Sequence, residues 1–206
     1  YLIIGTIGTG ILSLAVIFMM CLMVFSSQNA DCWNDDTTID DGGTTIGGDW
    51  KDPNSATHKA MQHAIDRFHK EVKMSGDNIA AAIAIGIRES GFNPKAVNPA
   101  GSVKGIWQWG AGGVNGNRYG DTADTVQAQV QLAINELHSS HKATLISLAA
   151  ADNINSSMVA WDTKFEGVGV NDPQRKVADT AKTAKAVKKI FNLDFPGDIA
   201  VFDGGN

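Results

Sequence analysis

Apolar residues recur at helical spacing through most of the chain between residues 57 and 193. Several runs place an apolar side chain at every third or fourth position, which is the period of one face of an α-helix. Three such stripes consist of Met61, Ile65, Phe68 and Val72; of Val126, Val130, Ile134 and Leu137; and of Val177, Ala181, Ala184, Val187 and Phe191. The pattern therefore predicts a compact, mainly helical domain over residues 57–193, a usual length for one domain.

Three further segments are apolar without being clearly one-sided. Residues 78–90, with the sequence NIAAAIAIGIRES, are apolar nearly all round at their start, which indicates a helix buried on most of its sides. Residues 143–151 form a short apolar stretch, and residues 156–166, SSMVAWDTKFE, follow as another expected helix.

Polar residues mark the expected helix ends. Asp77 is a candidate N-cap for the buried helix, Asp121 or Thr122 for the next helix, and Asp172, followed by Pro at N1, for the last one. Residues 93–120 are dense in Gly, Pro and Asn. We therefore expect a long loop region there, with room for a short hairpin.

The first 25 residues have a different character. Residues 2–25 contain 24 positions and not one charge. A helix of that length rises about 36 Å, enough to cross a hydrocarbon core. A signal-peptide core and a buried helix are the alternatives, but the former has an apolar run of only about 7–15 residues. We expect a membrane anchor over residues 1–25, with the domain on the extracellular, cell-wall side, because the following flank lacks Lys and Arg.

The charges are unevenly spread. Residues 26–56 carry seven Asp and one Lys, a net charge of 1 − 7 = −6, and are rich in Gly, Thr and Ser, which is typical of a flexible spacer. Residues 57–206 carry sixteen Lys and Arg against fifteen Asp and Glu and are close to neutral. Nucleic-acid binders normally carry a basic stripe, so we expect no nucleic acid among the partners. Residues 194–206 either close the domain or begin a linker to a further module.

The sequence predicts no cofactor and no metal site. The two cysteines, Cys21 and Cys32, lie outside the predicted domain, so they supply neither a disulfide framework nor a CxxC metal site within it. His138 and His141 are three residues apart but lack nearby acids or cysteines at a known ligand spacing, which favours a solvated helix end.

One carboxylate stands at the end of the buried helix and carries the candidate chemistry. Burial and the negative end of a helix dipole both disfavour ionisation of Glu89, so its pKa is expected to be raised, as a general acid requires. Gln108 can hold a sugar amide or hydroxyl, and Trp107, Trp109 and Tyr119 offer flat faces against which sugar rings pack. The alternative is that Glu89 pairs with Arg88 or Lys95 on the surface and that the tryptophans belong to the core.

The order of these motifs resembles the lysozyme-like superfamily, and most closely the phage-tail-lysozyme type of peptidoglycan hydrolase. The resemblance runs from about Ala64 to Phe191. It rests on Glu-Ser-Gly-Phe-Asn-Pro at residues 89–94, Gly-Ile-Trp-Gln-Trp at 105–109, the Gln-rich helix TVQAQVQLAINEL, and Phe165-Glu166 with a downstream Arg175. Two departures are the single Arg118, where the family has an Arg pair, and the large Trp107, where a smaller or aliphatic residue is usual.

The resemblance implies a mainly α, lysozyme-like α+β fold and a role for each matching residue. Glu89 becomes the catalytic acid, and Gln108 becomes a groove residue near it. Ser90 supports either the Glu89 carboxylate or the turn that follows. Glu166 either completes the glycan site or pairs with Arg175 to hold the last two helices, and we favour the second role.

The implied activity is cleavage of the MurNAc–GlcNAc bond of peptidoglycan. Hydrolysis by two carboxyl groups needs a partner for Glu89, and Asp121, Asp124 and Glu166 are candidates. A lytic transglycosylase needs only one Glu, and the sequence does not separate the two reactions. Resemblance to tethered wall hydrolases, with the anchor and spacer, implies service to a conjugative or type IV secretion machine and contact with its subunits; a phage origin is the other context. The alternatives from other classes are an inactive glycan-binding module and a pore or assembly subunit.

Overall fold

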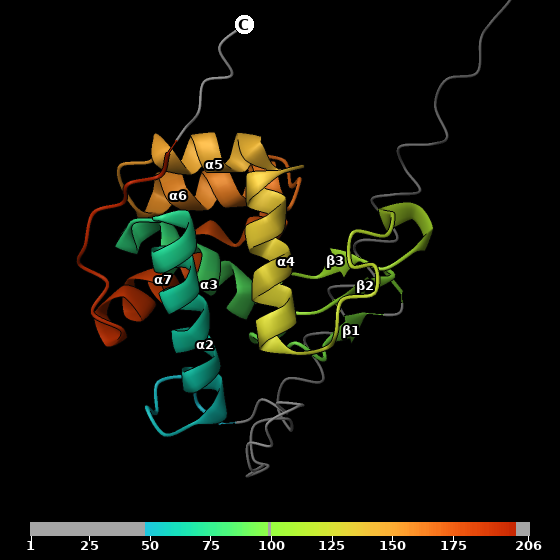
Figure 1. Cartoon of the computed structure of the whole chain (residues 1–206), viewed down its shortest axis with the longest axis horizontal. Helices are drawn as coiled ribbons and strands as arrows, with labels where there is room; N and C mark the ends of the chain where they lie inside the picture. Colours follow the sequence, from blue (N-terminus) through green and yellow to red (C-terminus); the bar gives the residue numbers. More distant parts are fainter. Residues whose placement is uncertain (1–47, 99, 201–206) are drawn as a thin grey trace, which may run out of the picture.

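The computed structural model describes residues 48–98 and 100–200. Its α-helices are α2 (Ala56–Arg67), α3 (Gly76–Ser90), α4 (Val126–His138), α5 (Lys142–Ala149), α6 (Ile154–Ala160) and α7 (Val177–Ile190). Its shorter elements are the π-helical turns η1 (Phe68–Val72) and η3 (Trp161–Phe165), the 3₁₀ turns η2 (Gly113–Asn115) and η4 (Pro173–Arg175), and the strands β1 (Val97–Asn98), β2 (Val103–Lys104) and β3 (Trp109–Gly110). The predicted mainly helical class is confirmed. Figure 1 shows the other helices gathered on one side of α4 and the small sheet on its other side.

Helix α3 lies at the centre of the domain, as its apolar sequence predicts. It packs against α2, α6 and α7 and against both π-helical turns. Its N-cap is Ser75 and not the predicted Asp77. The Ser75 hydroxyl accepts from the Asn78 N–H, and the Asn78 side chain accepts from the Ser75 N–H, so a capping box satisfies two donors at once. Asp77 instead accepts a hydrogen bond from Lys188 of α7 at 2.7 Å.

Two other predicted helix starts are also wrong. The N-cap of α4 is Thr125, whose hydroxyl accepts from the Ala128 N–H, and not Asp121 or Thr122. Asp172 caps only the 3₁₀ turn η4, because Lys176 then adopts a left-handed backbone conformation with φ of 42° and the chain restarts as α7 at Val177. Val177 is consequently 47% exposed and does not face the core.

The loop region forms two successive antiparallel hairpins. Val97 and Asn98 of β1 pair with Lys104 and Val103 of β2, and these pair with Trp109 and Gly110 of β3. The turn into β3 begins at Gly105, whose φ is +81°. A Cβ at this position would lie 2.6 Å from Gln129 Oε1, so the backbone conformation and the close approach both require glycine.

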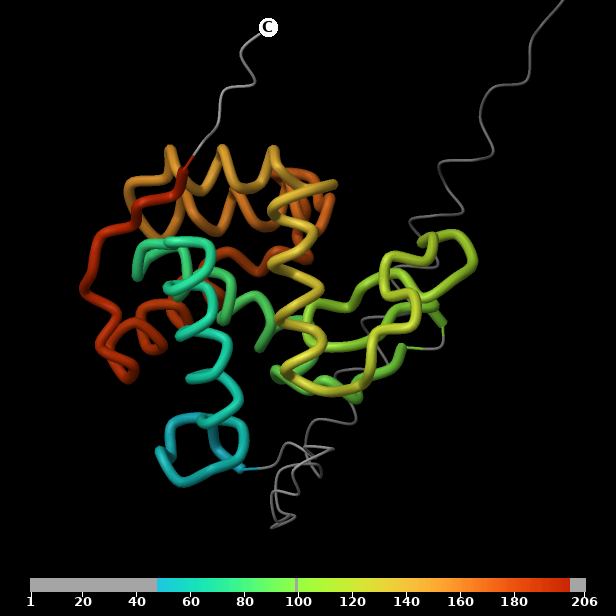
Figure 2. The backbone as a smooth tube through the Cα atoms, in the orientation of Figure 1, coloured from blue at the N-terminus to red at the C-terminus, as the bar shows by residue number. Residues whose placement is uncertain are grey.

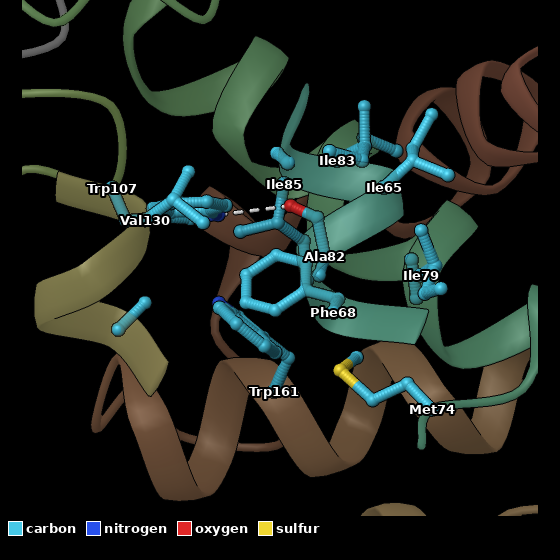
Figure 3. Packing of buried hydrophobic residues seen from close by; sticks show 14 of the residues in the cluster. Ile65, Phe68, Met74, Ile79, Ala82, Ile83, Ile85, Trp107, Val130 and Trp161 are labelled. Carbon is cyan, nitrogen blue, oxygen red and sulfur yellow. Dashed lines mark hydrogen bonds between the residues drawn. The ribbon is translucent and has the colours of Figure 1, made fainter. Parts of the chain in front are cut away.

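Aromatic rings from η1, from η3 and from the turn between β2 and β3 meet in the core next to α3. Phe68 of η1 lies 5.8 Å from Trp107 and 5.9 Å from Trp161 between ring centroids. Figure 3 shows these rings with Ile79 and Ile85 of α3, and the bond from Trp107 Nε1 to the Ala82 carbonyl, 2.9 Å long. The loop containing Trp107 is therefore fixed to the centre of the domain.

The chain beyond α7 packs back onto the domain as far as Ile199. Figure 2 shows this segment returning from α7 past the end of η1. The Gly76 N–H donates to the Phe195 carbonyl at 3.1 Å, and the Asp198 N–H donates to the Lys73 carbonyl at 2.8 Å. The rings of His69 and Phe195 lie 4.2 Å apart. These contacts hold the described part of the segment against the domain, while residues 201–206 lie outside the described residues.

At the other end, described residues before position 57 also contact the domain. Trp50 is partly buried against the core, and its carbonyl lies 2.9 Å from His58 Nδ1. The predicted anchor at residues 1–25 and most of the predicted spacer lie outside the described residues. Within residues 48–98 and 100–200, no helix is both long and apolar enough to cross a membrane.

Candidate active site

The Ser90 side chain joins the end of α3 to the turn between β2 and β3. The Ser90 hydroxyl donates to the Ile106 carbonyl at 2.8 Å and to the Gly86 carbonyl at 3.2 Å, and it accepts from the Asn93 N–H at 3.0 Å. Helix α3 ends here because Gly91 adopts the left-handed conformation of a C-cap. Of the two roles considered for Ser90, the structure shows support of the following turn.

Glu89 lies at the surface in the last turn of α3, and one of its carboxylate oxygens is unengaged by the described residues. Its Oε1 accepts from Arg88 Nη2 at 2.7 Å and from Arg88 Nε at 3.0 Å. Its Oε2 accepts no hydrogen bond from any residue that the structure describes, and the side chain is 29% exposed. The expected pairing with Arg88 is therefore present, and it leaves one oxygen of Glu89 open to a ligand.

Arg88 also joins a buried ionic network. Its Nη2 donates to Asp162 Oδ1 at 2.8 Å, and Arg175 Nε donates to Asp162 Oδ2 at 2.8 Å. The Asp162 side chain is 0% exposed. The prediction that Arg175 pairs with Glu166 is wrong, because the η3 turn directs Asp162 toward η4 and this carboxylate takes the Arg175 guanidinium.

Glu166 interacts instead with Glu89. Burial raises the pKa of Glu166 well above its usual range, and the negative charge of Glu89 raises it further. A hydrogen bond from Trp161 Nε1, 3.0 Å from Glu166 Oε1, and the charges of Arg118 and Arg88 act in the opposite direction. The two carboxyl groups are close enough for the charge of one to affect the protonation of the other.

Gln108 has an unusual backbone and a spare acceptor. Its φ of 48° is rare for a residue with a side chain and is typical of strained positions at functional sites. Its Nε2 donates to the Gly105 carbonyl at 2.9 Å, while its Oε1 is shielded from solvent and has no partner among the described residues. Its loop is bonded to the end of α3 through Ser90.

The aromatic side chains do not have the predicted role of lining a groove. Trp107, Trp109 and Tyr119 are 0%, 1% and 2% exposed, so their rings offer no free face to a sugar. Each polar tip is bonded inside the protein: Trp109 Nε1 donates to Glu136 at 2.8 Å and the Tyr119 hydroxyl donates to Asp124 at 2.7 Å. Burying three large rings stabilises the fold more than leaving them exposed for a ligand would. The structure therefore shows the alternative, in which the tryptophans belong to the core.

The sequence of this domain matches one family model. The model of the phage tail lysozyme family matches residues 59–191. The chain belongs to the phage tail lysozyme family. This family assignment confirms the resemblance seen from about Ala64 to Phe191 and makes the domain a lysozyme-like peptidoglycan hydrolase domain. Neither a curated protein nor a solved structure matches the chain.

Of the three candidate partners of Glu89 in this lysozyme-like domain, Glu166 is the one whose pKa is raised by the charge of Glu89, after the larger effect of burial. Asp124 is engaged elsewhere, since it accepts from Tyr119 and forms an ion pair with Lys104 at 3.1 Å. Its pKa is lowered, first by the bond from Tyr119. Asp121 is exposed in the loop before α4.

Sequence reasoning missed two buried polar residues of α4 that hold the site loops. Gln129 Oε1 accepts from the Ile106 N–H at 2.8 Å, and its Nε2 donates to the Pro94 carbonyl at 2.7 Å. Glu136 accepts from Trp109 and from Arg118. A signal for both existed, because Gln129, Ala133 and Glu136 follow each other at steps of four and three, within the core-facing side of the helix.

Proposed function

We propose that this domain cleaves the MurNAc–GlcNAc bond of peptidoglycan by hydrolysis, with Glu89 as the catalytic carboxyl and Glu166 as its partner. The observation that supports this proposal is the electrostatic coupling of Glu89 to a second carboxyl whose pKa is raised. Hydrolases of glycosidic bonds use two carboxyl groups, one as an acid and one as a base or nucleophile.

The charge arrangement suits that division of roles. Two neighbouring carboxylates repel each other, so the pair retains a proton at a pH where an isolated glutamate has lost its own. That proton is available to the leaving oxygen of the glycosidic bond, and the remaining carboxylate can activate water. We propose that Oε2 of Glu89, which accepts no hydrogen bond from any residue that the structure describes, is the atom that contacts the substrate.

The products distinguish the two reactions. Isolated cell walls are digested with the full-length protein, and the released muropeptides are analysed by mass spectrometry. Hydrolysis predicts products with reducing MurNAc ends. Products with 1,6-anhydro ends would replace this proposal with transglycosylation by Glu89 alone, and binding without any cleavage would favour the inactive glycan-binding module.

We also propose that the domain is tethered to the cell membrane on its wall-facing side, where it opens the wall locally for an envelope-spanning machine such as a conjugative secretion apparatus. The uncharged residues 2–25 and the acidic residues after them support this layout. The full chain is expected in the membrane fraction, and a chain lacking residues 1–47 in the soluble fraction with its activity on isolated walls intact. An equal distribution of both chains would contradict the tether, and loss of all function on deletion would favour a pore or assembly subunit.

A further inference from the structure

Arg118 connects the loop after η2 to two other parts of the domain. Its Nε and Nη2 donate to the two carboxylate oxygens of Glu136, each at 2.9 Å, and its Nη1 donates to the Phe165 carbonyl at 2.9 Å. The guanidinium also lies 4.9 Å from the centre of the Phe165 ring. An arginine with this many contacts has a fixed orientation, because its planar fork matches the carboxylate in two places.

The carboxylate that holds Arg118 is itself fixed by the core. Glu136 is 8% exposed and accepts a third hydrogen bond, from Trp109 Nε1 at 2.8 Å. His141 Nδ1 lies 3.9 Å from Glu136 Oε1, but burial, followed by the charge of Arg118, lowers the pKa of His141 and favours its neutral form. Arg118 is therefore the cation that neutralises Glu136 near neutral pH.

The contacts of Arg118 extend to the residue that precedes Glu166. The Phe165 carbonyl that Arg118 holds belongs to the peptide bond that leads into Glu166. The charged groups that act on the Glu166 carboxyl are Glu89 and Arg88 from α3 and Arg118 from the loop, and Trp161 of η3 donates a hydrogen bond to it. Arg118 differs from Arg88 because it forms no bond with Glu89, so its charge acts on Glu166 without also holding the first carboxylate.

We propose that Arg118, oriented by the buried Glu136, is a positioning residue that holds the Phe165 carbonyl and thereby fixes the adjacent Glu166 at the end of η3. The inference deepens the proposed function and rests on it, since Glu166 matters to catalysis only as the second carboxyl. It also assigns a purpose to the partly buried Arg118–Glu136 ion pair, which joins the loop to α4. The positive charge of Arg118 opposes burial and Glu89, both of which favour the protonated form of Glu166.

A titration of Glu166 tests the inference without relying on activity. The chain has four glutamates, so selective labelling with ¹³C at the carboxyl gives few signals, and Glu166→Gln identifies the relevant one. In Arg118→Met the positive charge is absent, so the titration midpoint of Glu166 is expected to move to higher pH. In Arg118→Lys the charge is retained and the midpoint is expected to stay close to that of the wild type. An unchanged midpoint in the Met variant would overturn the inference.

Two further variants keep the result interpretable. Arg118→Met leaves Glu136 buried without its cation, and if that variant does not fold, the double variant Arg118→Met with Glu136→Gln removes the unpaired charge. Arg67→Met is the matched control, because it breaks an Arg–Glu pair with Glu71 at the surface and should leave the Glu166 midpoint where it is.

The activity assay separates this inference from the proposed function. Arg118→Lys is expected to lower kcat by at least about tenfold with little change in KM, because lysine cannot hold the Phe165 carbonyl and both oxygens of Glu136 together. A kcat equal to that of the wild type would contradict the positioning role. Failure of the wild type to cleave walls would contradict the proposed function and leave the titration result standing.

Discussion

Replacing Glu89 with Gln is expected to lower the rate of wall cleavage by about 10²- to 10⁴-fold, the range that general acid–base catalysis contributes. The amide keeps the size of the side chain and can still accept from Arg88, so the domain should stay folded. It cannot exchange a proton with the glycosidic oxygen or with water. Release of soluble muropeptides from isolated walls measures the rate, and thermal unfolding shows that the fold is retained.

Glu71→Gln is the matched control for this experiment. Glu71 pairs with Arg67 at the surface on η1, and a surface pair of this kind contributes about 0.3–0.5 kcal/mol. This variant should cleave walls at the wild-type rate. Full activity in a folded Glu89→Gln variant would remove Glu89 from the mechanism and leave the domain as a glycan-binding module.

Replacing Asp162 with Ala is expected to destabilise the domain by about 3–5 kcal/mol, the cost of breaking a buried ion pair on one side. The Asp162 carboxylate is fully buried and accepts from Arg88 and from Arg175, so its removal leaves two guanidinium groups without their anion. Arg175 is also buried and already has one nitrogen, Nη2, without a partner in the described part of the chain. Urea unfolding followed by circular dichroism measures the loss of stability.

Asp194→Ala provides the comparison. Asp194 forms an ion pair with Lys188 at 3.4 Å, but its side chain is 85% exposed, and solvent screens such a pair. Its loss should change the free energy of unfolding by less than about 1 kcal/mol. Equal effects of the two substitutions would show that the buried network contributes no more than a surface pair, and that Arg88 does not need Asp162 to be held next to Glu89.

The network also explains why Glu89 is paired with a cation yet remains a candidate for catalysis. Arg88 divides its donors between the Glu89 carboxylate, the Asp162 carboxylate and the Arg175 carbonyl. A guanidinium held in this way by buried groups cannot move with Glu89 or cover both of its oxygens. The ion pair therefore orients Glu89 and leaves Oε2 open.

The sequence by itself determined the helical class, the central position of α3 and the place of Glu89 at its end. These follow from the spacing of apolar residues, because a stripe with a period near 3.6 can be buried only by a helix. The ordered motifs from Glu89 to Arg175 also sufficed to indicate the phage tail lysozyme family. Helix starts were less accurate, since Ser75 and Thr125 cap helices that Asp77, Asp121 and Thr122 could have capped equally well by residue type.

Only the tertiary structure decided which residues meet. The charge of Glu89 acts on Glu166, Arg175 pairs with Asp162, and Trp107 and Trp109 are core residues with bonded indole nitrogens. Each of these results depends on distances between elements far apart in the chain. A local pattern fixes which face a residue occupies on its own helix, but the partner on that face is set by how the helices pack. In this domain, that packing brings Arg88 of α3, Asp162 of η3 and Arg175 of η4 together.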